Sequence, residues 1–219
     1  MYAELHCHSN YSFQEGASSV EDLLVRARDL GHRALALTDH DNLCGAMHFA
    51  QVAKTLDIQS ITGVEMTIKD GEPGKDGTDG KDGSHLTFLA ENQEGYSQLS
   101  NLISYSYISS DRRNPALDLK YLPERVHGLI LLTGCRTGRV PSLLTEGRYA
   151  EAETQLRQYL DWFGTDNVFV ELQQNLVQGD TSRNRRLIDL ARKLGVGTVA
   201  TNNVHYHVPE RHRLQDALV

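Results

Sequence analysis

Histidine pairs near the two ends of the chain offer the clearest metal-binding chemistry. His6 and His8 lie two residues apart in a short strand-like run, and His205 comes two residues after Asn203. In an extended strand, residues i and i+2 point to the same face, so each pair presents two metal-competent groups side by side. We therefore expect a metal site that is assembled from both ends of the chain.

More ligand-type residues stand where predicted strands end. They are Asp39, His40, Asp41, Glu65 and Cys135. In barrels of alternating strands and helices, groups at the carboxyl ends of the strands converge on one mouth, where such folds place their chemistry. Histidine, cysteine and carboxylate together suit Zn, Mn or Fe better than an all-oxygen site for Mg or Ca. So many ligands predict more than one metal ion.

Predicted strands alternate with predicted helices along the chain. The strands are expected over residues 4–8, 34–38, 60–68, 86–90, 128–133, 168–172 and 197–201. The helices are expected over residues 18–30, 43–56, 94–106, 149–162 and 183–194, the first with a serine N-cap and Gly31 as its stop. This repetition predicts a mostly parallel sheet with helices outside. Bringing His6 near His205 favours closure of the seven strands into a barrel over an open sheet.

Composition limits the class of protein. A chain of 219 residues with 39% hydrophobic content can bury one sizeable core, so we expect a single domain over residues 1–219. Three cysteines without close spacing and no charged-then-apolar leader argue against a secreted disulfide framework. The apolar runs are too short to span a bilayer, and we expect a cytoplasmic enzyme or enzyme module without membrane contact.

The net charge of −7 argues against general attraction to nucleic acid. Contact with a phosphate backbone would have to come from local arginine clusters, and we expect most of these clusters to be solvated surface. The clusters are Arg112 with Arg113, Arg136 with Arg139, Arg183 with Arg185 and Arg186, and Arg211 with Arg213.

One segment interrupts the alternation of strands and helices. Glycine recurs at every third position from 71 to 83, between Glu, Pro, Lys and Asp, in a collagen-like composition. A trimerisation stub is one interpretation, but so few triplets in a loop anchored at both ends gain little from a triple helix. We interpret residues 71–84 as a flexible, solvated insertion between two strands.

Each ligand-type residue alone is weak evidence, and several histidines carry no motif. These are His32, His48, His127, His207 and His212. Cys7 and Cys44 are interpreted as small core residues. What carries weight is the order of six short motifs, nearly all at predicted strand ends, whose joint occurrence by chance is improbable. The motifs are HCH (6–8), TDH (38–40), GVE (63–65), HL (85–86), GC (134–135) and NNVHY (202–206).

This order resembles the polymerase and histidinol phosphatase (PHP) family over essentially the whole chain. Four longer segments resemble the PHP domain at the N-terminus of bacterial C-family DNA polymerases, and most closely the error-prone branch of the replicative alpha subunits. They are YSFQEGAS (11–18), HLTFLAENQEGYSQLSNLIS (85–104), LLTGCRTGRVP (131–141) and YHVPERHRLQDALV (206–219). The resemblance implies a larger protein, with the remainder of the polymerase chain as a partner.

The resemblance implies a distorted seven-stranded β/α barrel, a (β/α)7 TIM-like fold, with two to three divalent metal ions, Zn, Mn or Fe. Its implied ligands are His6, His8, Glu15, His40, Glu65, His85, Cys135, Asn203 and His205. Only the resemblance places His85 in the site, because His85 begins its predicted strand. The family has Asp at the positions of Glu15 and Asn203. Glu15 keeps the charge, whereas the neutral amide of Asn203 should hold a metal ion less tightly.

The implied reaction is metal-assisted hydrolysis of a phosphoester. Asp39 is expected to orient a ligand histidine, and Arg136 or Arg139 to hold a phosphate oxygen. In the polymerase branch the substrate would be a DNA 3′ end, trimmed by a 3′ to 5′ proofreading exonuclease. Two alternatives remain: a catalytically weakened module with a structural role in the polymerase, which Asn203 favours, and a stand-alone small-molecule phosphatase such as histidinol phosphatase.

Overall fold

The computed structural model describes residues 2–69 and 83–218. The chain divides into two compact units, unit 1 (Met1–Val64 and Thr201–Val219) and unit 2 (Glu65–Ala200), and each is described by itself. The predicted insertion at 71–84 lies outside the described residues except for its last two positions, and Ser84 is the first residue of a strand. That residues 1–219 fold as one domain stays a prediction.

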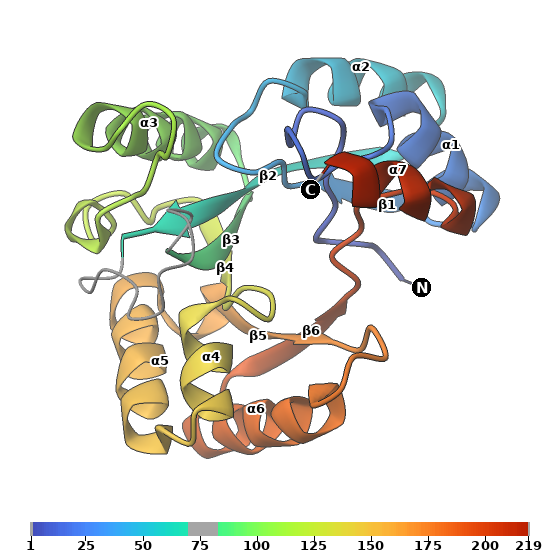
Figure 1. The fold of residues 1–219 in the computed structure, drawn as a ribbon. Helices are drawn as coiled ribbons and strands as arrows, with labels where there is room; N and C mark the ends of the chain where they lie inside the picture. The colour runs from blue at the N-terminus through green and yellow to red at the C-terminus, as the bar shows by residue number, and fades with distance from the viewer. Residues whose placement is uncertain (1, 70–82, 219) are drawn as a thin grey trace. The chain divides into compact units, whose positions relative to one another are not determined.

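Unit 1 contains the first predicted strands and helices close to where the sequence places them. Its elements are α1 (Val20–Asp29), β1 (Ala34–Leu37), α2 (Ala46–Thr55), the first part of β2 (Gln59–Ile68) and α7 (His212–Leu218). The Ser19 side chain caps α1 by accepting a hydrogen bond from the Asp22 backbone N–H, and Gly31 follows the helix at a φ of 76°. β1 runs parallel to β2, and α1 and α2 lie side by side (Figure 1).

The first expected strand, over residues 4–8, is not a regular strand and pairs at two isolated points. Glu4 forms a parallel bridge with Leu35 of β1, and Cys7 forms one with Val204. A regular ladder is interrupted because the intervening donors go to side chains: His6 N–H donates to Glu4 Oε1, and Cys7 N–H donates to the Thr38 hydroxyl. The described residues therefore form six regular strands where the resemblance implies seven.

Unit 2 continues the sheet from the second part of β2. In the sheet order, β2 is followed by β3 (Ser84–Ala90), β4 (Leu129–Leu132), β5 (Val168–Gln173) and β6 (Gly197–Thr201). The last residue of β6, Thr201, belongs to unit 1. The helices are α3 (Gln93–Ser109), α4 (Arg139–Thr145), α5 (Tyr149–Phe163) and α6 (Asp180–Leu194). β4 and β5 are parallel, but β3 pairs antiparallel with β4. The predicted mostly parallel pattern therefore has an exception at β3.

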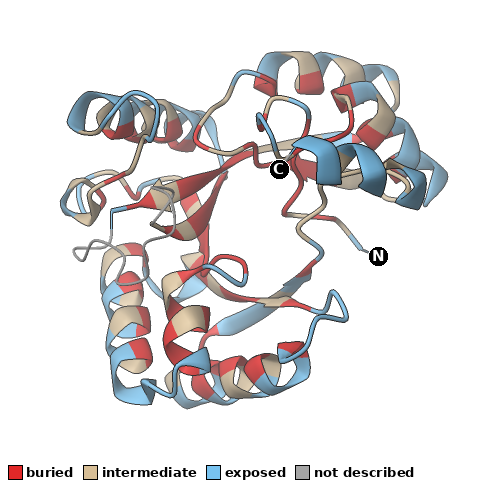
Figure 2. Ribbon diagram, viewed as in Figure 1, coloured by how far each residue is buried: buried red, intermediate tan, exposed pale blue. Residues whose placement is uncertain are grey.

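Most strands are buried and α1 to α6 each bury one face, whereas β6 is largely exposed and α7 buries no residue (Figure 2). Cys7 packs in the core of unit 1, as predicted, with Leu24, Phe49 and Leu35 among its cluster. Cys44 was expected in the core and is exposed, because its backbone N–H is held by Asn42 Oδ1 in the loop before α2. None of the helices within residues 2–69 and 83–218 has the length and apolar content needed to cross a bilayer.

Two short helices were not expected from the sequence. α4 has seven residues with a proline at its third position, and α7 has seven residues, none of them buried. Both are too short for a helical period of apolar residues to be recognised. α4 follows the glycine-containing turn that also carries Cys135, so it fixes where that turn ends.

Candidate metal centre

The implied ligands are divided between the two units. Unit 1 carries His6, His8, Glu15, His40, Asn203 and His205, and unit 2 carries Glu65, His85 and Cys135. In unit 1 the rings of His6 and His8 lie 5.2 Å apart, and ligand nitrogens of the two rings lie within 4.8 Å. The ring of His205 stacks on that of His8 with a centroid distance of 4.8 Å. The structure thus brings histidines from both ends of the chain together.

Asp39 organises this end of unit 1 through hydrogen bonds from Ser9 and Ser12. Its side chain, 1% exposed, follows β1 and accepts hydrogen bonds from the Ser9 backbone N–H and the Ser12 hydroxyl, both at 2.7 Å. The Ser9 hydroxyl also donates to it, at 2.8 Å. Sequence reasoning missed both serines. The only signal for them was their spacing of three in a turn, where hydroxyl side chains commonly bond to nearby groups.

The Ser12 hydroxyl sets which nitrogen of His8 carries the proton. The Ser12 hydroxyl has one proton and donates it in a hydrogen bond to the Asp39 carboxylate, so the Ser12 oxygen must accept at its other contacts. It accepts from the His40 backbone N–H at 3.0 Å, and it lies 3.1 Å from Nδ1 of His8. In a neutral His8 the proton is therefore on Nδ1, which leaves the lone pair on Nε2. A ligand histidine has this arrangement when a neighbouring oxygen fixes its tautomer.

His205 is held in the same tautomer by the backbone. Its Nδ1 lies 3.3 Å from the carbonyl oxygen of Glu15, which can only accept, so Nδ1 carries the proton and Nε2 the lone pair. Two stacked histidines with Nδ1 protonated present the same type of metal-competent nitrogen.

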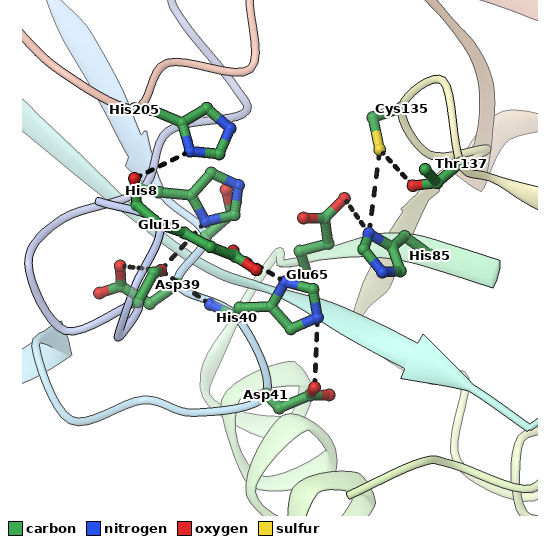
Figure 3. A network of polar contacts seen from close by, with 12 residues as sticks. His8, Glu15, Asp39, His40, Asp41, Glu65, His85, Cys135, Thr137 and His205 are labelled. Atoms are coloured by element: carbon green, nitrogen blue, oxygen red, sulfur yellow. Dashed lines mark hydrogen bonds and ion pairs between the residues drawn. The ribbon is translucent and has the colours of Figure 1, made fainter. Parts of the chain in front are cut away.

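His40 lies between two carboxylates (Figure 3). Its Nδ1 is 3.2 Å from Glu15 Oε2, and its Nε2 is 3.3 Å from Asp41 Oδ2. Two ligands of one tetrahedral zinc ion, each about 2.1 Å from the metal, are roughly 3.4 Å apart. The 3.2 Å between Nδ1 of His40 and Glu15 Oε2 is therefore close to the separation of two ligands that share one cation. Glu15, longer than the family's aspartate by one methylene, reaches this position.

Asn203 contributes a buried amide oxygen. Its Oδ1 has no hydrogen-bond partner within the described part of the chain, although it is shielded from solvent. The residue lies just beyond β6 with a φ of 51°, a left-handed conformation that Asn and Asp adopt more readily than most side chains. A buried acceptor without a donor is costly unless a cation or another donor approaches it.

In unit 2, the expected ligands also lie together. Nδ1 of His85 is 3.4 Å from Glu65 Oε1 and 3.9 Å from the Cys135 sulfur, which is 3.0 Å from the Thr137 hydroxyl. Gly134 brings the cysteine turn this close, because its φ is 86° and a Cβ there would lie 2.2 Å from the carbonyl oxygen of His85. Figure 3 shows these three contacts.

Cys135 is a thiol in the absence of a cation. Burial raises the pKa of its thiol well above the ordinary value, and the charges of Glu65 and Glu171 raise the pKa further. Glu171, on β5, is 2% exposed and accepts a hydrogen bond from Gln173 at 2.9 Å. Sequence reasoning gave Glu171 no role, because a lone carboxylate inside a predicted strand resembles a solvent-facing residue.

The arginines expected to contact phosphate differ in exposure. Arg136, directly after Cys135, is exposed in the turn between β4 and α4, whereas Arg139 is partly buried as the first residue of α4. Of the two, Arg136 has the greater freedom to reach a substrate.

Both ligand sets fit divalent metal ions. Unit 1 offers imidazole nitrogens, a carboxylate and a buried amide oxygen, and unit 2 offers a carboxylate, an imidazole and a sulfur. This mixture of donors suits Zn, Mn or Fe.

Comparisons with known proteins identify the family of the chain. The family model described as "PHP domain" matches residues 4–175. The chain is 40% identical to the DNA polymerase III subunit alpha of Treponema pallidum over 100% of its own length and 19% of that protein's. It is 43% identical to the error-prone DNA polymerase of Cutibacterium acnes over 99% of its own length and 19% of that protein's. The chain thus spans about a fifth of the length of these relatives.

A solved structure shares the fold at low sequence identity. A candidate metal-dependent phosphoesterase from Bifidobacterium adolescentis superposes with a TM-score of 0.58 at 14% identity, covering 93% of this chain and 87% of that one. At this identity the similarity shows the fold alone.

The hydrogen bonds of Ser12 lead to a first prediction. Ser12→Ala removes the acceptor that orients His8, so we expect affinity for Zn²⁺ to fall about tenfold or more, as measured by isothermal titration calorimetry. Ser104→Ala, an exposed serine on α3, is the matched control and should bind Zn²⁺ like the unmodified protein. Equal affinities for all three proteins would show that the Ser12 hydroxyl does not prepare His8 for a metal.

Proposed function

The chain belongs to the PHP domain family, whose model matches residues 4–175, and we propose that it is the PHP region of a bacterial C-family DNA polymerase, of the error-prone type, with metal-dependent phosphoesterase activity. Two polymerases at 40% and 43% identity over nearly the whole chain support this assignment. We propose a DNA 3′ end as the substrate, which the domain shortens as a 3′ to 5′ exonuclease.

One observation carries the proposal more than any other. His8 and His205 are stacked, and each donates a hydrogen bond from Nδ1 to an oxygen of the protein. In the neutral form each ring therefore has its lone pair on Nε2. A histidine that served only packing would not need the same tautomer as its neighbour. We propose that the nine implied positions hold two to three ions of Zn, Mn or Fe.

The side chains of this protein would divide the work of hydrolysis. Divalent ions, when bound, make a water molecule more acidic and offset negative charge on the phosphate. Arg136 donates hydrogen bonds to a nonbridging phosphate oxygen, which a guanidinium group does well. Asp39 and Ser12 keep His8 in one tautomer and one orientation, and Glu15 does the same for His205 through its carbonyl oxygen.

A second candidate function follows from Asn203. A neutral amide supplies less charge than the family's aspartate, so the domain would hold one ion weakly and would mainly support the rest of the polymerase chain. α7, with Leu214 and Leu218 exposed, is a surface on which that remainder could pack. The two relatives described above are polymerases, which favours a polymerase domain over a stand-alone histidinol phosphatase.

The direct test is shortening of DNA. Metal-depleted protein is supplied with Mn²⁺ or Zn²⁺ and a 5′-labelled single strand, and we expect stepwise loss of nucleotides from the 3′ end. His8→Ala should abolish the activity and lower the melting temperature of the metal-loaded protein, since bound metal stabilises the fold that binds it. His212→Ala, an exposed histidine outside the motifs, should change neither. Metal-loaded protein that leaves the strand intact would reject the exonuclease and favour the structural module.

Restoring the family's carboxylate at position 203 gives another prediction. Asn203→Asp should raise the rate of DNA shortening severalfold to about tenfold, because a carboxylate holds a cation more tightly and the backbone there tolerates Asp. Added Mn²⁺ should also raise the melting temperature of this variant more than that of the unmodified protein. The reason is that the new carboxylate is buried and its negative charge is costly until a cation binds. Asn101→Asp, exposed on α3, is the control. An unchanged rate and an unchanged response to Mn²⁺ would show that position 203 does not face a metal ion.

A further inference from the structure

Phe13 is an aromatic side chain that is exposed to solvent. It lies in the loop between the N-terminal segment and α1, two residues before Glu15, and 79% of it is exposed. Two residues along the backbone place its Cα within about 7 Å of the Cα of Glu15. The ring therefore lies in the same loop as a proposed metal ligand.

The loop that carries Phe13 has a fixed shape. Backbone hydrogen bonds join Ser12 N–H to Ser9 O at 2.9 Å, Glu15 N–H to Ser12 O at 3.1 Å and Gly16 N–H to Ser12 O at 2.9 Å. Gly16 allows this turn, because a Cβ at that position would lie 1.8 Å from the Ser9 carbonyl oxygen. The exposure of Phe13 is thus built into an ordered turn.

Another aromatic residue of the same loop behaves in the opposite way. Tyr11 is partly buried against the hydrophobic core of unit 1, and Asn42 donates a hydrogen bond to its carbonyl oxygen at 3.0 Å. The loop can therefore bury an aromatic ring, yet Phe13 lies two residues further on and faces water. Folding gains little from phenylalanine at this position, so the ring is available to a ligand.

We infer that Phe13 is a stacking platform for a nucleobase of the substrate, so that the site selects nucleotide strands over small phosphate esters; the inference rests on the proposed function. Every nucleobase has a face that stacks on an aromatic ring, and stacking does not depend on the charge of the protein. That independence matters here, because a net charge of −7 provides no general attraction for a phosphate backbone.

The test compares binding of two oligonucleotides to the whole chain. One is a fluorescein-labelled single strand, and the other is the same strand with abasic residues at its 3′ end. Phe13→Ala should weaken binding of the intact strand about tenfold in fluorescence anisotropy, by the same factor at low and high salt. Phe13→Tyr should restore binding. Ile108→Ala, which alters an exposed apolar side chain on α3, should bind like the unmodified protein.

The abasic strand identifies the stacking partner. We expect the unmodified protein and Phe13→Ala to bind it with equal affinity, because no base is present at its end. An equal loss of affinity for both strands, or no loss of affinity for either, would overturn the inference.

A competition experiment tests the assignment to nucleotides. Histidinol phosphate, whose imidazole also stacks, is added as a competitor. The assignment is overturned if histidinol phosphate displaces the strand at concentrations at which a mononucleotide does not. Absence of DNA shortening by the unmodified protein would reject the proposed function, while the binding difference would still decide the role of Phe13.

Discussion

The hydrogen bond from the Ser12 hydroxyl to Asp39, at 2.7 Å, is the contact on which the organisation of unit 1 depends. It ties the loop after the N-terminal segment to the end of β1, and it uses the only proton of the hydroxyl. Any other group that forms a hydrogen bond with this oxygen must be the donor, and this requirement fixes the tautomer of a neutral His8. The same loop carries Glu15, whose carbonyl oxygen fixes His205 and whose carboxylate lies beside His40. One buried carboxylate thus controls the orientation of ligands from both ends of the chain.

The two units prepare their ligands by different physical means. Unit 1 uses hydrogen bonds that assign protons to particular nitrogens, and no donor among residues 2–69 and 83–218 reaches the Asn203 oxygen. Unit 2 uses burial and nearby carboxylates, which raise the pKa of the Cys135 thiol and make its deprotonation dependent on an approaching cation. Both arrangements are costly in a protein that binds nothing, and both become favourable when a divalent ion compensates them.

Local patterns were enough to predict most elements, because strands and helices here follow hydrophobic period, caps and stops; α5 and β6 begin at the predicted residues. The meeting of His8 with His205 also followed from the spacing of histidines in strands. The direction of β3 did not, since pairing direction depends on how the chain enters a strand. The roles of Ser12 and Glu171 could not be predicted either, because a hydroxyl or carboxylate gains its role from partners distant in sequence.

The central claim is that the histidines of unit 1 hold divalent metal ions through Nε2. The most direct measurement is anomalous X-ray diffraction from crystals of the purified protein, collected on both sides of the zinc and manganese absorption edges. The account predicts an anomalous peak within about 2.3 Å of Nε2 of His8 or His205. A well-ordered map with no anomalous peak there, and with Nε2 of His8 hydrogen-bonded to a protein acceptor, would contradict it.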